Sequence, residues 1–378
     1  DVYKRQVHMS VMISGTGLFT PKEFITNEEL VQSFNQFVIN FNEENKDQID
    51  SGAIDALVPS SSEFIKKASG IEQRYVQDKE GILDITRMRP RLKERSNSEV
   101  SILAEMAIKA AEEAIKQSGI NSSDIDAVIC GCSNLQRAYP AVAIEVQKEL
   151  EISGYAYDMN VACSSATFSI QNAYNDIQSG LADKVLVVNP EICSGHLNFK
   201  DRDAHFIFGD AATAVILEKD SNSQSAFKIL GTSLKTQFSN NIRNNFGFLN
   251  LPENSDPKSP DKLFIQKGRS VFKEVVPMVQ AHIASHLDKL NIDIQEVKRL
   301  WLHQANLSMN QLIAKKLLGR EPDEQEMPII LNDYANTSSA GSIIAFHQTK
   351  GDFVSNEIGV ISSFGAGYSV GSVILQKI

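Results

Sequence analysis

Short, almost continuous apolar runs recur along the chain, separated by longer stretches in which apolar residues return every three or four positions. The short runs predict buried β-strands and the longer stretches predict amphipathic helices. We expect strands at residues 11–14, 127–132, 184–188, 214–218, 228–234, 299–302, 357–362 and 372–376. We expect helices at residues 99–118, 141–150, 164–179, 271–290, 309–318 and 338–350. This alternation favours a layered α/β fold.

The two halves of the chain carry the same succession of motifs. VICGCSN (128–134) corresponds to LWLHQAN (300–306), and CSSATFSI (163–170) corresponds to TSSAGSII (337–344), with an identical Ser-Ser-Ala step. In each half, an apolar strand begins 21 residues after the start of the second motif. This ordered repetition indicates two pseudo-duplicated α/β halves.

A polar stretch, KDSNSQSA (219–226), separates the two halves and is the expected connector. We therefore expect an N-terminal half at residues 9–218 and a C-terminal half at residues 227–378. Residues 1–8, DVYKRQVH, show neither a signal pattern nor a structural one. We expect them to be a non-native leader, with Met9 as the natural start.

The composition is that of an ordinary globular protein, with 378 residues, 42% hydrophobic and 22% charged. A net charge of −10 argues against nucleic acid as a partner. No apolar run approaches the length needed to cross a membrane, so we expect no membrane-spanning segment. Four cysteines do not make a disulfide framework and no signal segment opens the chain, so the expected location is a reducing cytoplasm.

Cys163 lies between the strand-like stretch YAYDMNVA and the helix expected from residue 164. A thiol at a helix N-terminus faces unpaired N–H groups and the positive end of the helix dipole, which lowers its pKa. Small neighbouring residues leave room for a substrate to approach the sulfur. The alternative is a buried structural cysteine, because free cysteines are among the most buried residues.

Two further polar residues lie where a strand ends or a helix begins. His303 follows the strand expected at 299–302, and Asn336 precedes the helix expected at 338–350. Ligands of open α/β sheets bind beyond the carboxyl ends of strands, so a duplicated arrangement would bring both residues to Cys163. Alternatively, His303 is a structural histidine and Asn336 a turn or helix-cap residue.

Cysteine, histidine and asparagine together point to carbon–carbon bond formation rather than hydrolysis. A thiolate accepts an acyl group as a thioester. Imidazole and carboxamide groups can then donate hydrogen bonds to the oxygen of a developing enolate. Decarboxylation would supply the carbanion, so no acidic residue is needed.

Four motifs occur in a specific order: DMNVACSSATF, HQANL, NTSSAGS and SSFGAGYSVGSVIL. Together they resemble the β-ketoacyl-acyl-carrier-protein synthase III family of thiolase-fold condensing enzymes, over most of the chain. The resemblance implies an α-β-α-β-α arrangement, a homodimer and no cofactor. It also implies a decarboxylative Claisen condensation. An acyl group from acyl-coenzyme A (acyl-CoA) or an acyl carrier protein (ACP) reacts with malonyl-ACP to give a β-ketoacyl-ACP.

The resemblance assigns roles to individual residues. It implies that Cys163 is the acyl-accepting nucleophile and that His303 and Asn336 assist decarboxylation. The oxyanion hole would use the backbone N–H groups of Cys163 and Ala366, where a Gly-Ala-Gly turn replaces the family's Gly-Gly-Gly. Tyr139 would reach across the dimer to close the partner's acyl pocket. The implied substrate-binding residues are Phe64, Tyr139, Arg202, Phe272 and Asn306.

Several positions depart from the family pattern around the expected binding surfaces. Phe64 replaces a tryptophan that stacks on the adenine of CoA, and Ala68 replaces a nearby arginine, whereas Arg202 matches a second arginine. These changes weaken the case for CoA and favour a carrier-bound donor. Because carrier proteins are acidic, they need a basic patch. The candidates are Arg87, Arg89, Arg91, Lys315 and Lys316, with a solvated charged loop as the alternative for the arginines.

Two segments, residues 34–60 and 77–97, are longer than in the housekeeping fatty-acid initiator. Loops of this kind, near the pocket mouth, usually change the choice of acyl group. They favour a specialised member that builds aryl polyenes, dialkylresorcinols or related secondary lipids.

Other functions are distinguished by single features. A degradative thiolase needs a second catalytic cysteine near the C-terminus, and a plant-type polyketide synthase needs a Gly-Phe-Gly-Pro-Gly motif, and both are absent. A non-decarboxylative, hydroxymethylglutaryl-type enzyme needs a glutamate base, for which Glu72 and Glu145 are the candidates. A catalytically silent partner subunit is a further alternative.

Cys130 and Cys132 share a strand face without a second ligand pair, so we expect no metal site.

Overall fold

The computed structural model describes residues 10–221, 223, 225–250, 256 and 259–378. The strands are β1 (Val11–Phe19), β2 (Glu23–Thr26), β3 (Gln73–Val76), β4 (Ala127–Gly131), β5 (Tyr155–Met159), β6 (Lys184–Ile192), β7 (Asp210–Lys219), β8 (Phe227–Ser239), β9 (Ile242–Asn244), β10 (Phe264–Gln266), β11 (Val297–Leu302), β12 (Ile358–Gly365) and β13 (Gly367–Lys377). The helices are α1 (Asn27–Glu44), α2 (Lys46–Asp50), α3 (Ser62–Ser69), α4 (Lys79–Leu83), α5 (Ile102–Ser118), α6 (Val142–Glu149), α7 (Ser165–Ser179), α8 (Gly268–Lys289), α9 (Leu307–Leu318), α10 (Leu331–Tyr334) and α11 (Gly341–Thr349).

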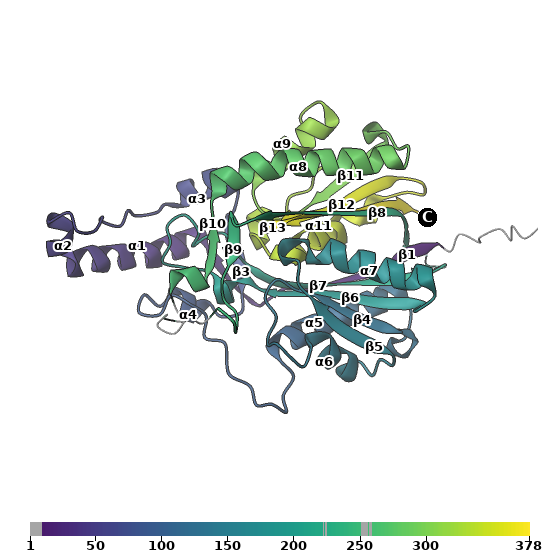
Figure 1. The fold of residues 1–378 in the computed structure, drawn as a ribbon, viewed down its shortest axis with the longest axis horizontal. Coiled ribbons are helices and arrows are strands. Elements are labelled where there is room, and N and C mark those ends of the chain that lie inside the picture. Colours follow the sequence, from purple (N-terminus) through teal and green to yellow (C-terminus); the bar gives the residue numbers. More distant parts are fainter. Residues whose placement is uncertain (1–9, 222, 224, 251–255, 257–258) are drawn as a thin grey trace, which may run out of the picture.

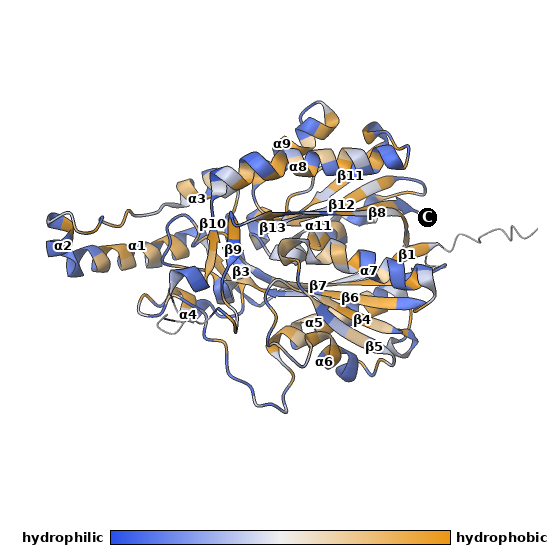
Figure 2. Cartoon of the chain, in the orientation of Figure 1, coloured by the Kyte–Doolittle hydropathy of each residue, from blue (hydrophilic) through white to orange (hydrophobic). Residues whose placement is uncertain are grey.

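These elements form five stacked layers, which confirms the predicted thiolase-like α-β-α-β-α fold. In Figure 1, α8 and α9 cover the upper sheet, α7 and α11 lie between the two sheets, and α5 and α6 cover the lower sheet. The strand β6 is hydrophobic along most of its length (Figure 2), because helices pack on both of its faces. Within the described residues, no helix has the length and apolar character needed to cross a membrane.

The two halves repeat one strand order. It is β5-β4-β6-β7-β1 in the N-terminal half and β11-β12-β13-β8 in the C-terminal half. In each half a parallel pair, β4 with β6 or β11 with β12, is followed by two antiparallel pairs. The halves join where β1 pairs with β8 at Met12–Lys228 and Ile13–Phe227. The exact boundaries stay a prediction, since residues 1–8 and residues 222 and 224 of the connector lie outside the described residues.

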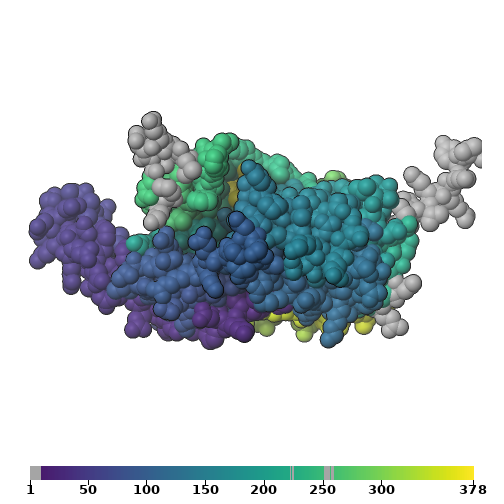
Figure 3. Space-filling model, turned by 90° about the horizontal axis from the view of Figure 1, so that it is seen from below, coloured from purple at the N-terminus to yellow at the C-terminus, as the bar shows by residue number. Residues whose placement is uncertain are grey.

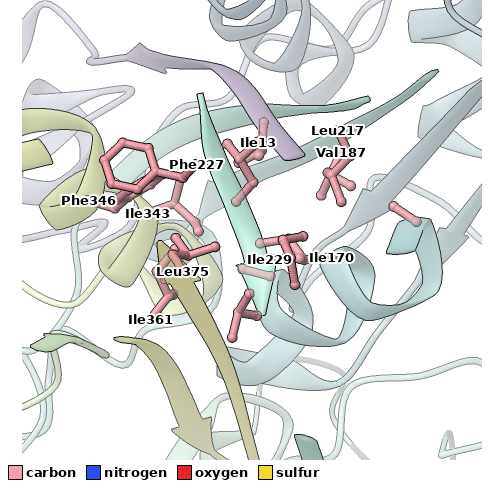
Figure 4. Packing of buried hydrophobic residues seen from close by; sticks show 14 of the residues in the cluster. Ile13, Ile170, Val187, Leu217, Phe227, Ile229, Ile343, Phe346, Ile361 and Leu375 are labelled. Carbon is pink, nitrogen blue, oxygen red and sulfur yellow. The ribbon is translucent and has the colours of Figure 1, made fainter. Parts of the chain in front are cut away.

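The central helices α7 and α11 supply the middle of the hydrophobic core. Ile170 of α7 and Ile343 of α11 are fully buried and belong to one cluster with residues of both sheets. Figure 4 shows this cluster, in which Ile170 and Ile343 lie among strand residues such as Val187 and Ile361. Both helices are therefore fixed by packing on two sides, which positions whatever their first turns carry.

The helix α7 approaches both sheets so closely that two strands need glycine. A Cβ atom on Gly131 of β4 would overlap Ser169, and one on Gly371 of β13 would overlap Thr167. Glycine at these two positions therefore lets the helix lie directly on both sheets.

The first predicted insertion is largely helical rather than a loop. The helix α1 begins after Thr26, whose side chain forms a capping box with Glu29. It buries only Leu30, Phe34 and Val38 among its large apolar residues, and with α2 it projects from the body as an arm (Figures 1 and 3). The second insertion, residues 77–97, is mostly irregular apart from α4.

We expect Gly371→Ala to lower the free energy of unfolding by about 1–3 kcal/mol, because the added methyl group must displace α7. Thermal denaturation followed by circular dichroism would show the lower Tm. Gly351→Ala is the matched control, since nothing lies within 4 Å of its Cβ position. Equal melting temperatures for the two variants would contradict the close approach of α7 to β13.

Candidate active site

Cys163 lies on a sharp turn that links a strand to the central helix. A 3-10 turn covers Ala162–Ser164, between β5 and the start of α7. Ala162 has a φ of 47°, a value that alanine rarely adopts. The partly buried thiol is therefore presented at the helix start, where the sequence predicts it.

The C-terminal half contains the same turn, but in a different register from the sequence match. Ser338 has a φ of 50° and begins a 3-10 turn before α11, as Ala162 does before α7. Cys163 therefore corresponds to Ser339, whereas the shared Ser-Ser-Ala step pairs it with Thr337. That alignment is wrong by two residues, because small side chains fit both registers and only the backbone turn distinguishes them.

His303 follows β11 directly, and its backbone is held on both sides. Its N–H donates to the Ser362 carbonyl at 2.8 Å, and its own carbonyl accepts from Asn310 Nδ2 at 3.0 Å. The imidazole packs edge-on against Phe364, with ring centroids 5.3 Å apart, and is 2% exposed. These contacts fix the ring at the carboxyl edge of the sheet.

Asn336 is anchored to the N-terminal half through its backbone. Its N–H donates to the Ile207 carbonyl and its carbonyl accepts from the Gly209 N–H, both at 3.0 Å. Its side-chain oxygen accepts from the Ser338 N–H at 2.8 Å. Because that oxygen is occupied, the amide NH2 is the group available to donate into the cavity that Asn336 lines.

Cys163, His303 and Asn336 line one cavity of about 490 Å³. Its exposed lining residues, which mark the mouth, are Ala68, Asp203, Gln266, Gly268 and Arg269. Its buried lining residues include Phe208, His303, Asn336, Phe364 and Gly365. The cavity thus runs from an exposed mouth to buried residues that include aromatic side chains and the candidate catalytic groups, an arrangement that suits a long flexible thioester.

Burial raises the pKa of Cys163 to about 11. The Ser338 hydroxyl, 3.5 Å from Sγ, opposes this rise, whereas the charge of Glu191 adds to it. The predicted lowering of the pKa by the helix N-terminus is therefore wrong. Desolvation outweighs the hydrogen bonds from the Ser338 hydroxyl and from the backbone of Ala366 and Cys163, which lower the pKa.

Burial also lowers the pKa of His303 to about 4. The imidazole is therefore neutral at physiological pH, and a neutral imidazole has one N–H to donate. Two neutral donors, His303 and Asn336, consequently line the cavity beside the thiol.

The Gly365-Ala366-Gly367 turn lies against the thiol. A Cβ atom on Gly365 would come within 2.6 Å of Cys163 Cβ and 2.9 Å of its Sγ. The left-handed φ of this turn, 130°, falls on Gly367 rather than on Ala366. The backbone of Ala366 lies near enough to Sγ for its hydrogen bond to lower the Cys163 pKa.

Known proteins resemble this chain over nearly its whole length. The models of 3-oxoacyl-ACP synthase III and of its C-terminal domain match residues 157–237 and 287–377. A β-ketodecanoyl-ACP synthase of Pseudomonas aeruginosa is 60% identical over 349 residues, which cover 92% of this chain and 100% of that protein. The chain belongs to the β-ketoacyl-ACP synthase III family. The predicted family and the predicted class, a condensing acyltransferase, are confirmed.

Solved structures support the fold of this synthase. The 3-oxoacyl-ACP synthase III of Aquifex aeolicus has a TM-score of 0.76 at 25% identity, covering 97% of this chain and 99% of that one. The corresponding Pseudomonas aeruginosa structure has a TM-score of 0.74 at 20% identity, covering 97% and 98%. Both solved structures thus share the thiolase-like architecture of this chain although their sequences are only 20–25% identical to it.

Four of the five predicted substrate-binding residues of the synthase lie at its cavity. Phe64, Phe272 and Asn306 line it. The Arg202 guanidinium stacks on the Phe64 ring at 4.0 Å. Tyr139 is the exception, because its side chain is 83% exposed and lines neither this cavity nor the second one described below.

The predicted carrier-docking residues are divided between two places. A second cavity, of about 1120 Å³, is lined by the three arginines Arg87, Arg89 and Arg91. Lys315 and Lys316 lie on α9, whose first turn contributes Met309 to the cavity of Cys163. Neighbouring carboxylates pair with Arg91 and Lys315. The three arginines therefore do not border the mouth of the Cys163 cavity.

Neither glutamate considered for hydroxymethylglutaryl-type chemistry lines the cavity. Glu72 pairs with Lys66 at 2.8 Å, and Glu145 accepts from Ser101 Oγ at 2.8 Å. The carboxyl group whose charge acts on the thiol is Glu191. Sequence reasoning missed it because it lies beyond the strand expected at 184–188, in the part of β6 that the sequence did not predict, and belongs to no motif.

We expect alkylation of Cys163 by iodoacetamide to accelerate about tenfold per pH unit between about pH 7 and 10, because only the thiolate reacts and the pKa is about 11. Intact-protein mass spectrometry would count the adducts. Cys163→Ser should gain none, since Cys130, Cys132 and Cys193 are fully buried and burial raises their pKa values. A rate that levels off near pH 8 would show an acidic thiol and contradict this expectation.

Proposed function

We propose that the synthase carries an acyl group on Cys163 and condenses it with malonyl-ACP, with loss of CO2, to give a β-ketoacyl-ACP. One observation carries this assignment: a thiol, a neutral imidazole and a carboxamide share the buried end of one cavity. The donor is a pantetheine thioester, the chemistry that acyl-CoA and acyl-ACP have in common.

In the first half-reaction, Cys163 Sγ attacks the carbonyl carbon of the donor. The new S–C bond replaces the bond to the pantetheine sulfur, and the proton of the cysteine leaves with the pantetheine thiol. The backbone N–H groups of Cys163 and Ala366 donate to the oxyanion of the tetrahedral intermediate. Because the thiol keeps its proton at neutral pH, deprotonation accompanies the attack.

In the second half-reaction, the malonyl carboxylate leaves as CO2 and its electron pair forms an enolate. His303 and Asn336 donate hydrogen bonds to the enolate oxygen, one through its imidazole N–H and the other through its amide NH2. The carbanion attacks the acyl thioester, a C–C bond forms, the C–S bond to Cys163 breaks, and the departing thiolate takes up a proton from solvent. No charged base is required at any step.

We infer that the acyl group has eight carbons. The 60% identical relative is named for β-ketodecanoyl-ACP, a ten-carbon product. Malonyl contributes two carbons after CO2 is lost, which leaves eight for the acyl group. Phe206, Phe208 and Phe264 give the cavity an apolar lining that suits a saturated chain. The specialised secondary-lipid role stays a prediction from the insertions.

The test of this function is intact-protein mass spectrometry after incubation with acyl-CoA and acyl-ACP donors of increasing chain length. We expect a covalent acyl mass on the wild type, greatest with the octanoyl donor, and none on Cys163→Ser. Malonyl-ACP should then release β-ketodecanoyl-ACP. If no donor acylates the wild type, the function is refuted. A preference for an acyl chain of another length refutes only the eight-carbon inference. Comparison of the CoA and ACP donors that carry the same acyl group shows which carrier the enzyme accepts.

We expect His303→Ala and Asn336→Ala each to slow condensation by roughly 100-fold or more, the scale of one lost oxyanion donor. Rapid-quench measurements would follow condensation of the preformed acyl-enzyme with malonyl-ACP. His282→Ala is the control, because it removes a buried histidine that bonds to the Ser233 carbonyl outside the cavity. Unchanged condensation in the first two variants would refute the roles given to both residues.

We also propose that two copies associate and that Tyr139 of each closes the acyl pocket of the other. The support is its large ring, 83% exposed on the single chain. Light scattering should give twice the chain mass of 41.7 kDa. Tyr139→Asp should weaken the dimer, whereas Leu181→Asp, at another exposed apolar position, should not. A monomeric wild type would contradict this assembly.

A further inference from the structure

Glu191 is a fully buried carboxyl group that the proposed reaction does not use. It lies near the end of β6, has no exposed surface and lines neither of the two cavities. Burying a carboxyl group is unfavourable unless its oxygens are hydrogen-bonded. Its position therefore calls for a structural or chemical reason.

The carboxyl group of Glu191 joins two turns from different halves of the chain. Its Oε1 accepts from the Ser133 N–H at 3.0 Å and from the Ser339 N–H at 3.3 Å, and the Ser339 hydroxyl also donates to it. Its Oε2 accepts from the Ser133 hydroxyl at 2.6 Å. Ser133 follows β4 in the N-terminal half, and Ser339 lies in the turn before α11 in the C-terminal half. One side chain thus clamps the two halves together.

The clamped turn also makes the contacts to the reacting groups. Ser338, next to Ser339, donates its hydroxyl to Cys163 Sγ at 3.5 Å. Its N–H occupies the side-chain oxygen of Asn336 at 2.8 Å, which leaves the amide NH2 to donate. A shift of Ser339 would therefore move a donor to the thiol and the orientation of Asn336 together.

The two halves differ at the strand position that Glu191 occupies. Glu191 lies five residues beyond Leu186, which pairs with Val128. Gly365 lies five residues beyond Val360, which pairs with Leu300. The corresponding strand positions thus carry a glutamate that binds Ser339 and a glycine that leaves space for Cys163, the counterpart of Ser339.

We propose that Glu191 is a positioning residue of the condensing site, which clamps the Ser133 and Ser339 turns and so holds Ser338 and Asn336 in place around Cys163. This inference rests on the proposed function of Cys163. The clamp works through hydrogen-bond acceptance, so a neutral isostere should preserve it. In Glu191→Gln the side-chain oxygen can accept both backbone N–H groups, and the NH2 can donate to the Ser133 hydroxyl.

The protonation of Glu191 gives a second, independent readout. Burial raises its pKa to about 7, with the Ser133 and Ser339 hydroxyls opposing the rise. The titratable groups around it are the thiols of Cys130, Cys132, Cys193 and Cys163. His303 lines the same cavity as Cys163. Between about pH 6 and 8 the imidazole is neutral and the Cys130, Cys132 and Cys193 thiols are protonated, so Glu191 is the group near Cys163 whose charge changes.

The test compares Glu191→Ala, Glu191→Gln and Ser339→Ala in the full-length protein, with Asp210→Asn as a matched control. Asp210 is an equally buried carboxyl group that binds Ser194 and Gln77 instead. We expect Glu191→Ala and Ser339→Ala to lower kcat for condensation at least tenfold with little change in KM. Glu191→Gln and Asp210→Asn should stay within threefold of the wild type. If Glu191→Ala fails to fold, Ser339→Ala and Glu191→Gln still test whether Glu191 acts as a clamp.

The charge is read from the pH profile of Cys163 alkylation. Glu191→Gln should shift the profile to lower pH, because a negative charge that opposes the thiolate is removed, while Asp210→Asn should not shift it. Condensation within threefold of the wild type in Ser339→Ala, or a Glu191→Gln variant as slow as Glu191→Ala, would overturn the clamp. An identical alkylation profile in Glu191→Gln would overturn its electrostatic link to Cys163. Wild-type protein that accepts no acyl group would instead refute the underlying function.

Discussion

The contact between two strand-to-helix turns, one from each half of the molecule, is the interaction on which the site depends. Cys163 touches Ser338 of the opposite turn and lies against Gly365 of the opposite sheet. Both turns lead into helices, α7 and α11, that are enclosed between the two sheets. Because packing holds each helix on two sides, neither turn can move without disturbing the central core. The duplicated fold thereby supplies rigidity to groups that are far apart in the sequence.

Burial at this junction determines the protonation of the reacting groups. The imidazole of His303 is kept neutral, with a pKa of about 4, and the thiol of Cys163 is kept protonated, with a pKa of about 11. In the proposed reaction, charge therefore develops only as the steps proceed, on the sulfur, the tetrahedral oxygen and the enolate. Fixed neutral dipoles stabilise such transient charge well in a dry site, because they need not reorganise. An isolated thiolate would be costly there for the same reason.

Elements with long apolar patterns could be predicted from the sequence, and short or solvated ones could not. The predicted helix at 164–179 matches α7 within one residue, because its buried positions recur at helical spacing over four turns. The arm helix α1 was missed, since it buries a narrow stripe and is otherwise polar. Strands such as β9 and β10, with three residues each, carry too little periodicity to be distinguished from loops.

The candidate site divides in a similar way. Cys163, His303 and Asn336 lie in recognisable motifs. Ser338 also lies in one of them, NTSSAGS, but its contact with Cys163 is made across the fold, as are the contacts of Glu191 with Ser339. The pKa of Cys163 illustrates why such features escape prediction. The helix start that favours the thiolate is visible in the local sequence, but the burial that outweighs it comes from Gly365 and other residues remote along the chain.

The positions that depart from the family pattern lie in two places, one beside the thiol and one nearer the mouth of the cavity. Beside the thiol, Ala366 replaces a glycine for which we propose a role of the backbone N–H alone, and Gly367 takes the unusual φ. Phe64 and Ala68 line the same cavity nearer its mouth, where Ala68 is exposed and Phe64 is half-buried. The Arg202 guanidinium lies directly on the Phe64 ring, so a nucleotide base would have to part the two before stacking between them. The proposed donor-binding positions thus lie apart from the thiol, imidazole and amide, so substitutions there need not disturb those three groups.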